Sequence, residues 1–239
     1  MTTRKRLAVL AVLAAAACSD STGPEPGTTT MLGNGTLQTF IERGPGGAPT
    51  ALGVTFDSGM LAGLPLADTF MTVKLPSAAG GTVYTHLYFD FVPHGHEPAG
   101  VYDTAHFDFH FYFIPPDLRE LIPAGVDTFT VPAAIIPTNF RKVTESVSRM
   151  GTHWADSTGP ELNGGGWNRS MIYGYHEGQF KFYDIMVTRH WLQTTPTDTV
   201  AFNQPASFPA SGYYPTKFTV RYDAATRRFR IAMEGFVQR

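Results

Sequence analysis

Two closely spaced histidines, His94 and His96, are the residues of this chain best suited to bind a metal ion. They lie in the segment Pro-His-Gly-His-Glu-Pro at residues 93–98. In an extended segment, residues two apart have Cα atoms about 6.6 Å apart and point to the same side. Two imidazoles at that spacing can converge on one ion at a Zn–N distance of about 2.0 Å. The spacing therefore predicts a metal site at His94 and His96, where the neighbouring Glu97 could act as a catalytic general base.

A second histidine-rich pattern, His-Phe-Asp-Phe-His-Phe-Tyr-Phe, begins ten residues after His96. Side chains alternate between the two faces of a strand, so His106, Asp108, His110 and Tyr112 would share one face and the four phenylalanines the other. His106 and His110 would have Cα atoms about 13 Å apart, too far to bind one ion on a regular strand. One of them, or Asp108, could add a metal ligand while the other supports the site from outside. Asp108 could also accept an imidazole N–H and fix its tautomer, and Tyr112 is a further candidate supporting residue.

More distant residues could complete such a site. His153, in the segment Met-Gly-Thr-His-Trp, is a candidate ligand, and His86 is a candidate supporting residue. Asp184 is predicted to share a strand face with Phe180 and Phe182, and a carboxylate on an apolar face must be paired, protonated or metal-bound. The alternative is a buried hydrogen-bond network that only fixes strand register and loop shape.

Two predicted strands, residues 82–92 and 105–114, would carry this face. In the first strand, alternation separates two sets of residues: Thr85, Leu87, Phe89 and Phe91 on one face, and Tyr84, His86, Tyr88 and Asp90 on the other. Pairing of the two strands would give one apolar face for the core and one face of His, Asp and Tyr. The second combination is typical of a cavity with fixed hydrogen bonds.

The rest of the chain indicates an all-β fold. Aromatic residues make up 13% of the sequence, and 24 glycines and 18 prolines interrupt it, which favours short strands separated by turns. We expect an antiparallel β-sandwich or barrel with one or two short helices. Further strands are predicted at residues 35–42, 51–57, 70–75, 129–131, 140–147, 179–188, 217–222 and 228–233, and helical turns at 58–64, capped by Ser58, and at 117–122.

The first residues resemble an export signal. A basic start precedes the uncharged run LAVLAVLAAAA, which is too short for a bilayer that needs roughly 20 residues. Residues 1–17 are therefore predicted to be a signal peptide, and Cys18 the lipidated first residue of the mature protein. Residues 18–30 would form a flexible tether and residues 31–239 a single β-rich domain. This predicts a periplasmic or cell-surface protein whose only contact with the outer membrane is its lipid anchor.

The composition of the chain limits which partners, metal ligands and catalytic motifs it can have. The net charge is −2 and no basic stripe runs through the chain, which argues against a nucleic-acid partner. Cys18 is the only cysteine, so the mature domain has no disulfide and no thiolate ligand. Histidine with carboxylate suits Zn²⁺ or Cu²⁺ as the cofactor. The sequence contains no HExxH, no Gly-x-Ser-x-Gly and no phosphate-binding glycine loop.

Three segments resemble a secreted bacterial domain family of unknown function. The first, PHGHEPAGVYDTAHFDFHFY, is similar to a signature in which PHGHEP is followed by HFDFHFY. MGTHW and IYGYHEGQFKFYDIMVT are similar to further blocks, so the resemblance extends from about residue 31 to about residue 195. The family favours a glutamate-proline pair where this chain has Asp184-Ile185. The resemblance implies a β-rich exported domain that can form homo-oligomers, and it implies no activity.

The sequence is compatible with three functions. The first is an exported lipoprotein domain that binds a divalent metal through its His, Asp and Glu residues. The second is a metal-dependent hydrolase or oxidoreductase, in which three protein ligands leave a position for a water with a pKa near 7. The third is a non-catalytic structural or interaction lipoprotein. It would use its aromatic loops, residues 164–167 and 213–214, to contact a protein or a glycan.

Overall fold

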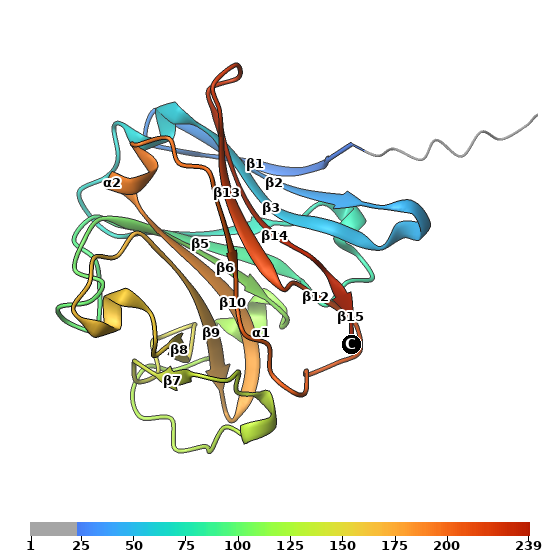
Figure 1. Ribbon diagram of the computed structural model, residues 1–239, viewed down its shortest axis with the longest axis vertical. Coiled ribbons are helices and arrows are strands. Elements are labelled where there is room, and N and C mark those ends of the chain that lie inside the picture. Colours follow the sequence, from blue (N-terminus) through green and yellow to red (C-terminus); the bar gives the residue numbers. More distant parts are fainter. Residues whose placement is uncertain (1–22) are drawn as a thin grey trace, which may run out of the picture.

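Two antiparallel sheets form the frame of the molecule, in a computed structural model that describes residues 23–239 (Figure 1). The predicted signal peptide and Cys18 lie outside the described residues. The first sheet has the strand order β1 (Glu25–Leu32), β2 (Gly35–Arg43), β3 (Pro49–Asp57), β14 (Arg228–Glu234), β13 (Lys217–Asp223) and β11 (Asp198–Ala201).

The second sheet has seven strands and carries the candidate site. Its order is β4 (Thr69–Lys74), β5 (His86–Val92), β6 (His106–Tyr112), β10 (Gln179–Thr188), β9 (Arg169–His176), β8 (Thr152–Asp156) and β7 (Phe140–Lys142). The remaining elements are a two-stranded sheet of β12 (Tyr213–Tyr214) and β15 (Val237–Gln238), the helices α1 (Pro116–Arg119) and α2 (Arg189–Leu192), and 3-10 turns at Pro45–Gly47, Ser58–Leu61, Ser77–Ala79, Ala133–Ile135 and Pro160–Asn163. Within residues 23–239, no helix has the length and apolar character needed to cross a lipid bilayer.

The main apolar core lies between the two sheets. The first sheet contributes Val54, Phe56 and Ile231, and the second contributes Phe89 and Phe109, all fully buried in one cluster. Complete burial of such a side chain stabilises a fold by about 1.5–3 kcal/mol. The all-β prediction is thus confirmed, and its sandwich alternative holds, because both sheets of the described chain are open at their edges.

The second sheet is buried on its other face as well. Every residue of β5 and β6 is buried, although only alternate residues reach the main core. Tyr102 and Trp167 pack over one part of the outer face in a cluster with Ile172 and Met186. Met150 packs over another part with three aromatic residues, Tyr88, Tyr112 and Phe182. The outer face is therefore an enclosed layer between the sheet and the loops that cover it.

A β-bulge changes the direction of side chains in β10. The register between β9 and β10 shifts between Phe180 and Phe182, which leaves Lys181 as an extra residue. Phe180 consequently packs in the main core, whereas Phe182 packs on the outer face. The prediction that Phe180 and Asp184 share a face was therefore wrong, and Asp184 shares a face with Phe182 alone.

Other predictions need correction at the ends of elements. Strand β5 begins at His86, so Tyr84 precedes it and packs in the main core, not on the polar face. The 3-10 turn after β3 is capped by Asp57, whose carboxylate accepts a hydrogen bond from the Gly59 N–H, and not by Ser58. Strand β1 begins at Glu25, inside the predicted tether. The segment 129–131 forms no strand, and the strand expected at 140–147 ends at Lys142.

Candidate metal centre

Two groups of histidine and aspartate side chains lie on the outer face of the second sheet. We call His96, His106 and Asp108 the outer cluster, and His110, His153 and Asp184 the inner cluster. In each group, one ligand atom from every residue lies within 4.8 Å of the others. Each group therefore offers two imidazole nitrogens and a carboxylate, which is a donor set for a divalent transition metal.

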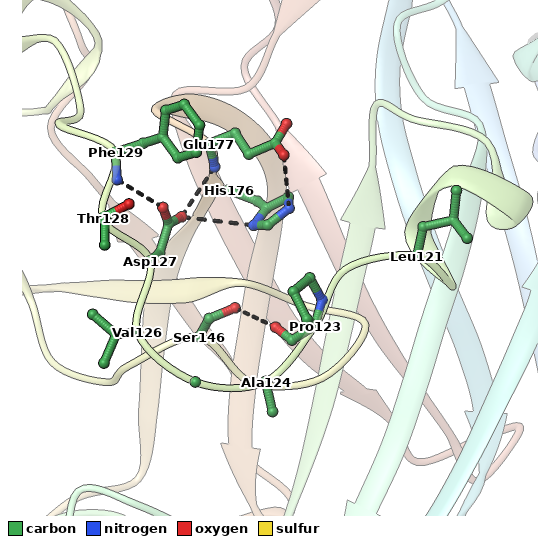
Figure 2. Close-up of a pocket in the computed structure, with 11 residues that line it drawn as sticks. Leu121, Pro123, Ala124, Val126, Asp127, Thr128, Phe129, Ser146, His176 and Glu177 are labelled. Atoms are coloured by element: carbon green, nitrogen blue, oxygen red, sulfur yellow. Dashed lines mark hydrogen bonds and ion pairs between the residues drawn. The ribbon is translucent and has the colours of Figure 1, made fainter.

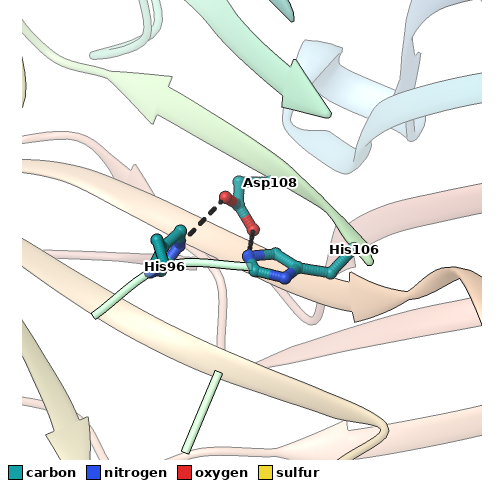
Figure 3. A group of neighbouring side chains, drawn as sticks. All are labelled: His96, His106 and Asp108. Carbon is teal, nitrogen blue, oxygen red and sulfur yellow. Dashed lines mark hydrogen bonds and ion pairs between the residues drawn. The ribbon is translucent and has the colours of Figure 1, made fainter. Parts of the chain in front are cut away.

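The outer cluster is built around the Asp108 carboxylate (Figure 3). Its Oδ2 lies 3.3 Å from Nε2 of His96, and its Oδ1 lies 3.3 Å from Nε2 of His106. Ligand atoms around a tetrahedral zinc lie roughly 3.4 Å apart, given Zn–N bonds of about 2.0–2.1 Å. Each imidazole nitrogen thus lies at that spacing from an oxygen of Asp108, and one ligand atom of each residue lies within 4.8 Å of the others.

Backbone carbonyls orient both imidazoles of the outer cluster. Nδ1 of His96 lies 2.6 Å from the carbonyl oxygen of Glu97, and Nδ1 of His106 lies 2.6 Å from that of Thr104. A carbonyl oxygen can only accept, so each Nδ1 carries the proton and donates. Each Nε2 is left facing Asp108, which is the arrangement of metal-bound histidines whose other nitrogen is fixed by a backbone carbonyl.

One contact in the outer cluster is incomplete. Nε2 of His106 and Oδ1 of Asp108 are buried, and neither has a hydrogen-bond partner among the described residues. Aromatic rings close the space around them, since Trp167 packs edge-on against His106 at 4.8 Å and Tyr102 against His96 at 5.8 Å. Buried polar atoms without partners are costly, and a cation between them would satisfy both.

The charges of the outer cluster favour an ionised carboxylate. Burial alone would raise the pKa of Asp108, but the charge of His106, together with the hydrogen bond and charge of His96, holds it well below its usual range. Burial would lower the pKa of His96, yet the hydrogen bond and charge of Asp108 outweigh burial and raise it to about 9. An ionised carboxylate is the form that binds a metal.

The inner cluster joins three strands of the same sheet. His110 and Asp184 are direct partners in the β6–β10 register, and His153 comes from β8, two strands further along. Oδ1 of Asp184 accepts a hydrogen bond from the backbone N–H of Phe109 at 3.1 Å. Its Oδ2 lies 3.6 Å from Nε2 of His110, close to the ligand–ligand spacing around zinc.

Burial and neighbouring charges separate the pKa values of the inner cluster. Burial lowers the pKa of His153 to about 3, and the nearby charges of His110 and His96 add to this. Burial also raises the pKa of Asp184 to about 8 despite the charge of His110, because Asp108 and Asp90 lie near it. For His110 burial would lower the pKa, but the carboxylates of Asp184 and Asp90 raise it to about 10.

Asp90 belongs to this face, and the sequence-based candidates for the site did not include it. Its Oδ1 lies 3.2 Å from Nδ1 of His110, and Asp90 is the direct partner of Asp108 in the β5–β6 register. Burial raises the pKa of Asp90. The alternation of residues 86–92 had already placed Asp90 on the polar face, and that alternation was the signal that could have identified it.

The structure does not place His94 in either cluster. The chain turns at residues 93–94, and Gly95 adopts a φ of 73°, so the segment is not extended as the spacing argument assumed. A side chain at Gly95 would meet the carbonyl oxygen of Tyr102 at 2.0 Å, so only glycine fits this turn. His94 is therefore exposed on the turn, whereas His96 folds back over the sheet and pairs with Tyr102.

The remaining predicted residues lie around the clusters. His86 stacks on Tyr112 with ring centroids 4.9 Å apart, and burial together with the charge of Arg119 lowers its pKa to about 3. The Tyr112 hydroxyl donates to the carbonyl oxygen of Arg149 at 2.9 Å. These contacts fix the end of the strand pair, and His86 belongs to neither metal-ligand group.

A cavity of about 340 Å³ opens onto both clusters. Four of its lining residues are cluster members: His96, Asp108, His110 and His153. Asp90 also lines the cavity, and Glu97, an exposed residue, lies on its wall. Apolar side chains make up much of the rest: Phe70, Val92, Val147 and Met150. The clusters are thus reachable by a small molecule.

A second cavity, of about 350 Å³, lies under the loop of residues 121–129 (Figure 2). One of its two acidic residues, Asp127, accepts hydrogen bonds from the backbone N–H groups of Phe129 and Glu177 and lies 3.6 Å from Nδ1 of His176. Both carboxylate oxygens are thus used to hold the loop against the β9–β10 turn. This arrangement indicates a structural role for the loop contacts.

Comparison with known proteins gives one family match. The family described as TTHB210-like (Hypothetical protein TTHB210) matches residues 45–91, from the β2–β3 turn to strand β5. The match includes His86 and Asp90 and ends before both clusters. No curated protein and no solved structure matched the chain. Residues 45–91 are therefore similar to a domain family of unknown function, which is the part of the expected family resemblance that the comparison supports.

Proposed function

We propose that this protein is an exported lipoprotein whose β-sandwich binds a divalent metal ion, zinc or copper, at the outer cluster. The observation that carries the proposal is the orientation of His96 and His106. Backbone carbonyls hold both Nδ1 protons, and both Nε2 atoms face the same buried carboxylate at 3.3 Å. The nitrogen and carboxylate donors suit Zn²⁺ and Cu²⁺.

Charge supports the same conclusion. Asp90, Asp108 and Asp184 are exposed by only 2%, 1% and 1%, and they lie on one face of one sheet. Within residues 23–239, no lysine or arginine forms an ion pair with any of them, and histidine is their only cationic partner. Buried carboxylates need compensating charge, and a divalent cation would supply it.

The direct test is the metal content of the full-length chain, purified without an affinity tag and incubated with zinc or copper. We expect His106→Ala to lose one bound ion per chain relative to the parent, because it removes a ligand of the outer cluster. His94→Ala is the matched control. It removes a histidine from the same segment of the sequence, but one that is exposed and belongs to neither cluster, and we expect it to keep the parent's metal content.

Three results would count against the proposal. Equal metal content in the parent and in His106→Ala would show that the outer cluster holds no ion. Loss of metal in His94→Ala but not in His106→Ala would favour the site first predicted from the sequence. A parent that binds neither metal would leave the histidines as a structural hydrogen-bond network, and the protein as a non-catalytic interaction lipoprotein.

A catalytic role for the same site is a second candidate, favoured by the cavity. Its wall carries Glu97 beside His96, where a carboxylate could remove a proton from a metal-bound water. Hydrolysis of p-nitrophenyl ester and phosphoester substrates by the zinc-loaded chain tests this role. Slower turnover in Glu97→Gln at unchanged metal content would support it, and equal turnover would exclude Glu97 as the base.

The lipoprotein part of the proposal depends on the sequence before the domain. A basic start, an apolar run and then Cys18 are the features of a lipidated export signal. Labelling of the chain with a radioactive fatty acid in bacterial cells, and loss of the label in Cys18→Ser, would support the anchor. Soluble, unlabelled parent protein would exclude it.

A further inference from the structure

We infer that the inner cluster is a second metal site, so that the outer face of the sheet carries a two-ion centre open to one cavity. This inference rests on the proposed metal-binding function and extends it to His110, His153 and Asp184. The two clusters have no residue in common. Each supplies two histidines and one aspartate, which makes the inner cluster a repeat of the outer donor set.

The inner cluster has the geometry of a ligand set before any ion is added. Oδ1 of Asp184 is engaged by the Phe109 N–H, which leaves Oδ2 free of the backbone. Oδ2 lies 3.6 Å from Nε2 of His110, which is too long for a hydrogen bond but near the roughly 3.4 Å between ligands of a tetrahedral zinc. The hydroxyl oxygen of Thr144 lies 3.3 Å from Nδ1 of His153 and can accept its proton, so that Nε2 remains for a ligand.

Asp90 provides a second, independent indication. It is 98% buried and lines the cavity beside His110 and His153, and its Oδ1 has no hydrogen-bond partner among the described residues. Although that oxygen lies 3.2 Å from Nδ1 of His110, the same nitrogen faces the carbonyl oxygen of Tyr88 at 3.1 Å. A buried carboxylate oxygen that faces a cavity without a donor is best satisfied by a cation.

The outer and inner clusters cannot share a single ion. His106 and His110 are four residues apart on a regular strand, which separates their Cα atoms by about 13 Å. An ion held by His106 therefore lies beyond the reach of His110 and of its partner Asp184 on β10. The cavity nevertheless contacts members of both clusters, so the two ions would lie side by side along its floor.

The test is the number of zinc ions bound by the full-length chain, measured by elemental analysis and by calorimetric titration. Asp184→Asn and His153→Gln alter the inner cluster with little change of volume, and His106→Ala alters the outer cluster. We expect two ions in the parent, one in each single-cluster variant, and none when His106→Ala and Asp184→Asn are combined. His190→Ala changes an exposed histidine outside both clusters and should retain two.

The possible results separate this inference from the proposed function. A parent with one ion, lost only in His106→Ala, would overturn the inner site and leave the outer site standing. One ion lost only in Asp184→Asn and His153→Gln would show a site at the inner cluster, and would overturn both the outer site and the two-ion centre. One ion lost in every variant of either cluster would mean a single shared ion and would overturn the two-ion centre.

Circular dichroism shows whether the variants fold. If they do not, cobalt titration of the parent tests the inference instead. The absorption of tetrahedral Co²⁺ should saturate at two equivalents, and saturation at one equivalent would overturn the two-ion centre.

Discussion

At the scale of single residues, the surroundings of each histidine decide what it can do. His94 and His96 have the same type and the shortest useful spacing, yet only His96 reaches a carboxylate. The sequence predicted His96, His106 and Asp108 as candidates, and the structure brings these three side chains together as a group that could hold a metal ion. It could not predict which of the two histidines reaches Asp108, because the turn at Gly95 leaves His94 exposed and brings His96 beside Tyr102.

Asp57 shows how a single carboxylate can fix a turn. It accepts hydrogen bonds from the N–H and the hydroxyl of Thr36, at 2.7 and 2.8 Å, and from the N–H of Gly59 at 3.0 Å. Burial would raise the pKa of Asp57, but these hydrogen bonds and the charge of Arg228 lower it. The carboxylate therefore stabilises the fold above its unfolded-state pKa, and this stability is lost as the pH falls through the folded-state value.

We accordingly expect Asp57→Asn to reduce the free energy of unfolding by about 1 kcal/mol at neutral pH, because hydrogen bonds to an ionised carboxylate are stronger than those to a neutral amide. The difference between parent and variant should shrink at an acid pH below the lowered pKa of Asp57, where the parent's own carboxylate is protonated. Urea unfolding followed by tryptophan fluorescence at the two pH values measures both quantities. A difference that stays constant with pH would contradict the role assigned to the charge.

At the scale of elements, alternation predicted the strands that carry the site and failed where the strands are irregular. It separated the apolar and polar faces of β6 correctly, since Phe107, Phe109 and Phe111 lie in the main core. It placed Phe180 on the wrong face, because the bulge adds one residue to the strand and the order of apolar and polar residues does not reveal it. Strands β8 and β9 were not predicted at all, and the pairing that brings His153 to His110 depends on strand order, which residue types do not specify.

The bulge in β10 also explains a glycine in β9. Its register places Gly174 opposite Phe182, and a Cβ on Gly174 would lie 2.0 Å from the Phe182 ring. That ring packs edge-on against both histidines of the inner cluster, at 5.1 Å from His110 and 5.4 Å from His153. The absence of a side chain at residue 174 is therefore what allows Phe182 to support the cluster.

We expect Gly174→Ala to destabilise the protein by about 1–3 kcal/mol, because overpacking forces the Phe182 ring out of its position. Gly166→Ala is the matched control, since a Cβ there meets nothing within 4 Å. Thermal unfolding monitored by circular dichroism gives the comparison. Equal melting temperatures for the two variants would mean that Phe182 can move without cost, and that it does not fix the inner cluster.

At the scale of the whole molecule, the candidate centre lies outside the main core of the sandwich. It occupies the layer between the second sheet and the loops that cover it, and its residues come from four places: the loop after β5, strand β6, strand β8 and strand β10. Protein contacts alone leave this layer with buried polar atoms that lack partners. Ions bound there would join the covering loop to the sheet and would stabilise the folded chain over the unfolded one.

This coupling predicts a stability that depends on metal concentration. At a free zinc concentration 100 times the dissociation constant, each occupied site should add about 2.7 kcal/mol to the free energy of unfolding, provided that zinc does not bind the unfolded chain. Urea unfolding of the full-length chain with and without zinc measures the gain.

The combined variant His106→Ala/Asp184→Asn should show no gain in the free energy of unfolding, because it lacks a ligand in each cluster. His94→Ala should gain as much as the parent. A zinc-dependent gain in the combined variant would place the ion elsewhere in the molecule. The absence of any gain in the parent would mean that protons and hydrogen bonds alone balance the three buried carboxylates.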